Sequence, residues 1–153
     1  MHGRRLASQS GHTLIELLTV LAIIALLVTA AVPSMTAYME RNRARSALDR
    51  ITNDIAYARV MAVRSGSRVT LDFTGVAAYE IIEEGPPSRV LRAVALGKDY
   101  PGVTIIPPTG DGRLVFDARG MLRSAPTGSI VARSGSGADS ASITMAGRVY
   151  RAY

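Results

Sequence analysis

An almost unbroken run of apolar side chains begins close to the start of the chain, and a single carboxylate stands directly before it. The run extends from Leu17 to Val32 and is preceded by Glu16. A carboxylate at the centre of a membrane helix costs about 2.5–3.5 kcal/mol on insertion scales. We therefore expect Glu16 to have a function and its charge to have a partner.

Two ordinary kinds of segment have a similar composition. A secretory signal peptide would use Arg4 and Arg5 as its basic region and residues 29–31 as an Ala-x-Ala-like cleavage site. An anchor that is never cleaved would run from Leu14 to Val32, and its 19 residues can span about 30 Å of hydrocarbon. The apolar run of 16 residues is slightly long for a signal peptide. Neither alternative explains why the acid follows a glycine by five residues.

The junction between the leader and the apolar run resembles a known processing site. Arg4 and Arg5 lie in a short polar leader that ends at Gly11, and Thr-Leu-Ile-Glu begins two residues later. This arrangement is similar to the cleavage site of type IV prepilins and type II secretion pseudopilins. That family most often has Phe where this chain has His12, at a position that tolerates variation.

The resemblance implies a mechanism of processing and assembly. A prepilin peptidase would cleave between Gly11 and His12, and the new amino group of His12 would be methylated and stay cationic. Arg4 and Arg5 would hold the leader in the cytoplasm. The chain would then cross the inner membrane once, with its C-terminal domain in the periplasm, and would enter a pilus or pseudopilus. Glu16 would be an assembly residue that pairs with the N-terminal ammonium of a neighbouring subunit.

The spacing beyond the apolar run predicts that the same helix continues. Pro33 should kink it, because proline removes an intrahelical hydrogen bond and clashes with the preceding turn. Ser65 and Gly66 should end it. The second half carries an apolar stripe at steps of three and four residues, formed by Leu48, Ile51, Ile55, Ala58 and Ala62.

After Gly66 the pattern becomes alternating, as in strands. The sequence predicts a flexible loop at 134–139 and short strands at 69–73, 76–83, 89–96, 103–106, 114–117, 130–133, 143–145 and 149–152. We therefore predict an α+β fold in which the long N-terminal helix packs on a small, mostly antiparallel β-domain. The expected parts are a cleaved leader (1–11), a transmembrane and assembly half-helix (12–33), an amphipathic half-helix (34–65) and a periplasmic β-domain (66–153).

Later motifs resemble the GspH/FimT group of minor pilins and pseudopilins. They are Ala-Val-Pro-Ser at 31–34, Ala-Arg-Val-Met-Ala at 58–62, Leu-Val-Phe-Asp-Ala-Arg-Gly at 114–120 and Ala-Gly-Arg-Val-Tyr-Arg at 146–151, whereas 76–112 match least. The group implies a minor pilin that helps to initiate or cap a pilus, with other major or minor pilins as partners. A minor pseudopilin of a type II secretion system is the alternative.

The sequence does not indicate an enzyme. Both histidines, His2 and His12, precede the apolar run and cysteine is absent, so the remainder has no imidazole base, thiol nucleophile or common zinc ligand set. Asp111, Asp117 and Asp139 are scattered without the spacing of a calcium loop. We therefore expect neither a cofactor nor a metal.

Charge is segregated along the chain. Residues 113–153 carry six arginines and two acids, whereas 72–111 carry three basic and six acidic residues. Arginine is suited to bidentate phosphate contact, and the resemblance implies DNA as the ligand, because some members of that family serve DNA uptake. The candidates for contact with DNA are Arg123, Arg133, Arg148 and Arg151. The alternative is that they are solvated or pair with acids of adjacent subunits.

Overall fold

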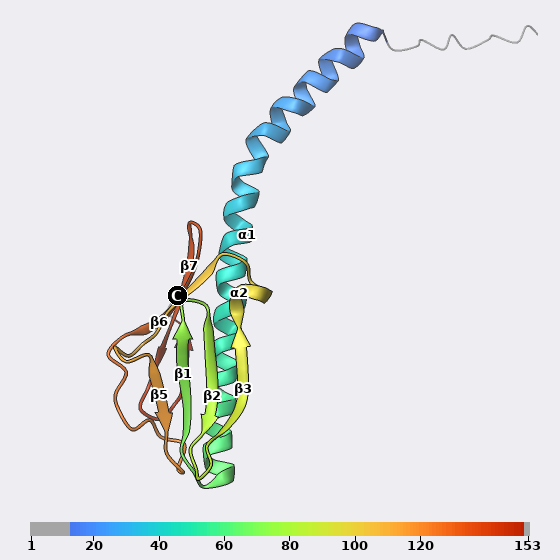
Figure 1. Ribbon diagram of the computed structural model, residues 1–153. Coiled ribbons are helices and arrows are strands. Elements are labelled where there is room, and N and C mark those ends of the chain that lie inside the picture. Colours follow the sequence, from blue (N-terminus) through green and yellow to red (C-terminus); the bar gives the residue numbers. More distant parts are fainter. Residues whose placement is uncertain (1–12, 152–153) are drawn as a thin grey trace, which may run out of the picture. The chain divides into compact units, whose positions relative to one another are not determined.

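The computed structural model describes residues 13–151, apart from the side chains of residues 30–33. These residues form two helices and two antiparallel sheets (Figure 1). The chain divides into two compact units between Thr36 and Ala37. The elements are α1 (Leu14–Ser65), β1 (Val69–Gly75), β2 (Ala78–Glu83), β3 (Arg89–Ala95), α2 (Leu96–Asp99), β4 (Val103–Ile106), β5 (Arg113–Phe116), β6 (Ser129–Ser134), β7 (Gly137–Ile143) and β8 (Val149–Arg151).

Thr13 caps the start of α1. Its hydroxyl oxygen accepts a hydrogen bond from the backbone N–H of Glu16 at 3.3 Å, and its carbonyl accepts one from Leu17 at 3.2 Å. Thr-x-x-Glu is also the sequence of a capping box. An acid in the first turn suits the partial positive charge of a helix N-terminus. The polar residues before the apolar run therefore set where α1 begins.

The first half of α1 carries apolar side chains on all sides. Between residues 14 and 28 the large apolar side chains are exposed in the isolated chain, from 48% at Val20 to 76% at Leu14. Among the described residues, α1 is the one helix that is long and apolar enough to cross a membrane. The helix continues through residue 33, and the kink at Pro33 stays a prediction.

The unit that begins at Ala37 contains both sheets. The first sheet has the strand order β3-β2-β1-β5 and the second the order β4-β6-β7-β8, and every pairing in them is antiparallel. Backbone hydrogen bonds also link the second sheet to the β1–β2 turn, from Ile105 of β4 to Val76 at 2.6 Å, and link the loops that follow β5 and β7, from Leu122 to Met145 at 2.9 Å. The predicted α+β fold with a mostly antiparallel β-domain is therefore confirmed.

The amphipathic half of α1 supplies one side of the core. All five residues of the predicted apolar stripe are fully buried. They share one core with side chains from both sheets, which include Tyr79 and Ile81 of β2, Phe116 of β5 and Ile130 of β6. Burial of each large apolar side chain contributes about 1.5–3 kcal/mol. The stripe therefore holds α1 against the sheets.

Some predicted strand limits are wrong. The segment 134–139 is not a loop, because β6 extends into it, β7 begins within it, and the turn consists of Gly135 and Ser136 alone. The predicted strand at 143–145 is also misplaced, since β7 ends at Ile143. Before Ile143, the residues of β7 are small or polar and lack the β-branched and aromatic side chains that signal a strand. The strand predicted at 103–106 has the same limits as β4, and residue 152, the predicted end of the last strand, lies outside the described residues. At the remaining predicted strands the limits differ by one or two residues.

The β6–β7 turn is held on α1. The backbone N–H and the hydroxyl of Ser136 both donate to one carboxylate oxygen of Glu40, each at 2.8 Å. A Cβ at Gly137 would lie 2.6 Å from the backbone nitrogen of Arg41. Such a distance is too short for any other residue without a backbone shift. The glycines of this segment therefore allow close approach to the helix.

We expect the contact between Glu40 and Ser136 to depend on pH. The pKa of Glu40 lies below its ordinary value because the backbone N–H and then the hydroxyl of Ser136 donate to the carboxylate, with a further contribution from the charge of Arg43. Because the contact lowers this pKa, its stabilisation is fully present at pH values above the ordinary pKa of glutamate, about 4.3. That stabilisation is lost as the pH falls through the lowered pKa of Glu40. The amide resonance of Ser136 should therefore titrate in the acidic range and should not titrate in Glu40→Gln. A resonance that titrates identically in both proteins would contradict the assignment.

Candidate functional site

The predicted processing residues Gly11 and His12 lie outside the described residues. Glu16 lies five residues beyond Gly11, in the first turn of α1, and is exposed in the isolated chain. The helix N-terminus stabilises a carboxylate there by its partial positive charge. In the proposed assembly, a neighbouring N-terminal ammonium would add to this effect.

A buried carboxylate fixes the second half of α1 on the first sheet. Asp54 is 2% exposed. Its oxygens accept hydrogen bonds from the Tyr79 hydroxyl at 2.6 Å, from Arg50 at 3.2 Å and from Arg92. The guanidinium of Arg92 also lies 4.5 Å from the centre of the Tyr57 ring. Burial, and next the hydrogen bond to Asp54, raise the pKa of Tyr79, so this hydroxyl stays protonated and donates.

Sequence reasoning missed the role of Asp54, although one signal was present. Asp54 follows Ile51 by three residues and precedes Ala58 by four, so it occupies the apolar stripe itself. An acid on a buried face needs partners. Tyr79, Arg92 and Arg50 provide them from β2, from β3 and from the preceding turn of α1. The cluster is an anchor between the helix and the sheet.

The four candidate DNA-binding arginines lie in two different environments. Arg151 pairs with Asp49 of α1 at 2.6 Å and with Asp139 of β7 at 3.3 Å. The side chains of Arg123, Arg133 and Arg148 are exposed and have no ion-pair partner among residues 13–151. Arg151 therefore fastens β8, whereas the other three are available to a ligand.

Each of the three aspartates considered as calcium ligands contacts a different part of the chain. Asp111 accepts a hydrogen bond from the backbone of Arg113 at 3.2 Å. Asp117 accepts two from the backbone of the turn that follows it, both at 2.9 Å, and Asp139 pairs with Arg151. In the part of the chain that the structure describes, no three metal-ligating side chains lie together.

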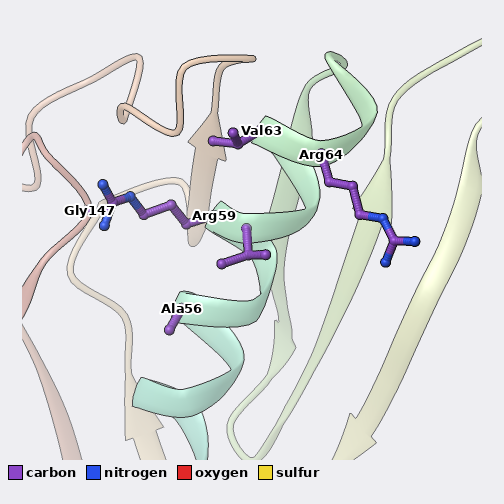
Figure 2. Close-up of a pocket in the computed structure, with 6 residues that line it drawn as sticks. Ala56, Arg59, Val63, Arg64 and Gly147 are labelled. Carbon is purple, nitrogen blue, oxygen red and sulfur yellow. The ribbon is translucent and has the colours of Figure 1, made fainter.

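A groove lies between α1 and the turn that contains Gly147. We call it the α1–Gly147 groove; its volume is about 460 Å³ and it is lined by Ala56, Arg59, Val60, Val63, Arg64 and Gly147. Figure 2 shows that Arg59 extends from α1 towards Gly147, whereas Arg64 extends to the other side of the helix. An adjoining hollow of about 410 Å³ shares Ala56, Arg59 and Gly147 and is also lined by Arg148.

Gly147 sets the width of this groove. Its φ is +67°, and a Cβ there would lie 2.9 Å from a ring carbon of Phe116 and 3.1 Å from the side chain of Arg59. The Arg59 side chain is held in place because its Nε–H donates to the carbonyl of Gly120 at 3.2 Å. The contacts of Arg59 and Gly147 therefore define one edge of the groove, and sequence reasoning did not identify it.

Comparisons with known proteins support the resemblance seen in the sequence. Residues 47–147 match the family described as type II transport protein GspH, and residues 6–32 match the prokaryotic N-terminal methylation motif. The comparison with curated proteins found no match.

Two solved structures of similar fold are crystal forms of the type IV minor pilin FimU of Pseudomonas aeruginosa PAO1. The first has a TM-score of 0.60 and 22% identity over 76% of this chain and 92% of that chain. The second has a TM-score of 0.56 and 20% identity over 71% of this chain and 92% of that chain. Because the GspH match alone covers most of the chain, this protein belongs to the GspH family of structural minor pilins and pseudopilins.

Proposed function

We propose that this protein is a minor type IV pilin that helps to initiate or cap a pilus. One observation carries the proposal: the same chain has a methylation motif over residues 6–32 and, after it, a family match over residues 47–147. The leader motif is suited to insertion into a filament, and the β-domain is suited to contact with other subunits. The fold shared with FimU, a type IV minor pilin, is the reason for placing the pilus first. The description of the matched family, type II transport protein, keeps the secretion pseudopilus as the alternative.

Processing follows from the same proposal. A prepilin peptidase cleaves between Gly11 and His12, and His12 is then methylated. The first half of α1 crosses the inner membrane once, and the β-domain lies in the periplasm. Other pilins then take up the mature chain, with Glu16 as the assembly residue. The single helix suited to a membrane span among the described residues supports this arrangement.

The test is removal of the gene, followed by complementation with the parent sequence. We expect loss of most surface pili and their recovery on complementation, with only trace amounts of the protein in sheared filaments. Secretion of extracellular proteins is measured in the same strains. Normal piliation with lost secretion would instead establish a minor pseudopilin of a type II secretion system. A strain that retains both functions would contradict either assembly role.

Contact with DNA is the second candidate function. The exposure of Arg123, Arg133 and Arg148 without ion-pair partners among the described residues favours it. Because each neutralised phosphate releases counterions, binding of duplex DNA should weaken steeply with salt. Replacement of Arg133 and Arg148 by Gln should reduce the salt slope by about two phosphate contacts. A parent chain that does not bind duplex DNA even at low salt would exclude this candidate.

A further inference from the structure

Two exposed valines distinguish one face of α1 from the rest of its second half. Val60 is 60% exposed and Val63 is 53% exposed, whereas the apolar stripe on the other face is fully buried. Both valines line the α1–Gly147 groove. A Cβ at Gly120 would lie 2.9 Å from Val63, so the loop before β6 reaches the same edge of the groove. An apolar surface is therefore fixed next to a hollow.

Arginines flank this apolar surface on both sides. Arg59 lies towards Gly147 and Arg64 lies on the other side of α1 (Figure 2), and Arg148 lines the adjoining hollow. Among the described residues, no acidic side chain lines either hollow. None of these three guanidiniums has an ion-pair partner among residues 13–151. The positive charge is therefore uncompensated within the described chain.

The valines and arginines of the groove together indicate which kind of ligand would bind there. The two exposed valines can contact apolar side chains of a bound segment, and guanidiniums pair well with carboxylates. A nucleic acid backbone would contact the arginines but would leave the valines without an apolar partner. A polypeptide segment with alternating acidic and apolar side chains satisfies both kinds of group.

We propose that the α1–Gly147 groove binds an acidic, apolar segment of a different subunit in the assembly. A second copy of this chain is less suited, because three of the six acids in 72–111 already form internal ion pairs: Asp72 with Arg113, Glu83 with Arg89 and Glu84 with Arg68. That the partner is a subunit of the assembly rests on the proposed function. That the bound segment is acidic and apolar rests on the groove residues alone.

The experiment uses the full chain in lipid nanodiscs, with empty nanodiscs as the baseline. Fluorescence anisotropy measures binding of a labelled peptide in which Glu and Leu alternate. Two matched peptides carry Gln for Glu or Ser for Leu, and unlabelled duplex DNA is the competitor. The groove variant is Val60→Ser with Arg64→Gln. The matched control is Val76→Ser with Arg45→Gln, which changes an exposed valine and an exposed arginine outside the groove.

We expect the Glu-Leu peptide to bind the parent and the control variant equally. Binding should be about tenfold weaker, which is about 1.4 kcal/mol, for the groove variant and for either matched peptide, because each of them lacks charge pairs, apolar contacts or both. The assignment is overturned if the Glu-Leu peptide fails to bind, if the groove variant binds like the parent, or if the Gln peptide binds equally well. Displacement of the peptide by duplex DNA would overturn it in favour of a nucleic-acid site. If the parent protein supports pili in the complemented strain but does not bind the Glu-Leu peptide, the groove assignment is refuted and the assembly role stands.

Discussion

Replacement of Asp54 by Ala is expected to reduce the free energy of unfolding by about 1–3 kcal/mol, because a buried hydroxyl is left without a hydrogen-bond acceptor. The Tyr79 hydroxyl would lose its 2.6 Å acceptor inside the core, and Arg92 would lose its carboxylate. Chemical denaturation of the detergent-solubilised full chain, followed by tyrosine fluorescence, measures the loss.

Arg50→Gln is the matched control for this prediction. Arg50 pairs with the same carboxylate at 3.2 Å, but its side chain is 46% exposed. Exposed pairs usually contribute at most about 1 kcal/mol, so the control should unfold close to the parent. If Asp54→Ala were as mild as Arg50→Gln, the cluster would not be the anchor between α1 and the first sheet.

The second large effect is expected at Glu16. Glu16→Ala should leave membrane insertion intact or improved, because a costly charge is removed, while the amount of protein in sheared filaments should fall several-fold. Glu16→Gln separates loss of helix capping from loss of charge pairing as the cause of a defect in incorporation. It preserves the Thr-x-x-Gln form of a capping box with Thr13 but lacks the charge needed to pair with a neighbouring ammonium.

The pairing account predicts that Glu16→Ala and Glu16→Gln are equally defective in incorporation and equally competent in insertion. Quantitative immunoblots of membrane and filament fractions provide both measurements. If the Gln variant enters filaments like the parent, the role of Glu16 in assembly is helix capping and not charge pairing.

The elements with regular periodicity could be predicted from the sequence, and the long-range contacts could not. The α1 stripe at steps of three and four residues is buried as expected, because period and burial are directly linked in a helix. By contrast, the β6–β7 turn has a Gly- and Ser-rich sequence that is typical of flexible loops. Its order comes from Glu40, which lies 96 positions earlier in the chain than Ser136, and no local pattern records such a contact.

The arginines illustrate the same difference. Composition indicated an excess of positive charge near the C-terminus, but it could not separate Arg151 from Arg148. The fold brings Arg151 to Asp49, 102 positions away, and leaves Arg148 exposed beside the groove. The groove itself depends on the approach of Gly147 to Arg59. Only the tertiary structure shows that these residues meet.

The intact mass of the protein extracted from membranes tests the account most directly. The proposed assembly role requires a mature chain that begins at His12 and carries one methyl group on its amino terminus. Fragmentation of the N-terminal peptide places that methyl group. A chain that still begins at Met1, or one that begins after residue 31 as a signal peptide would leave it, would contradict the assignment of this protein as a processed pilus subunit.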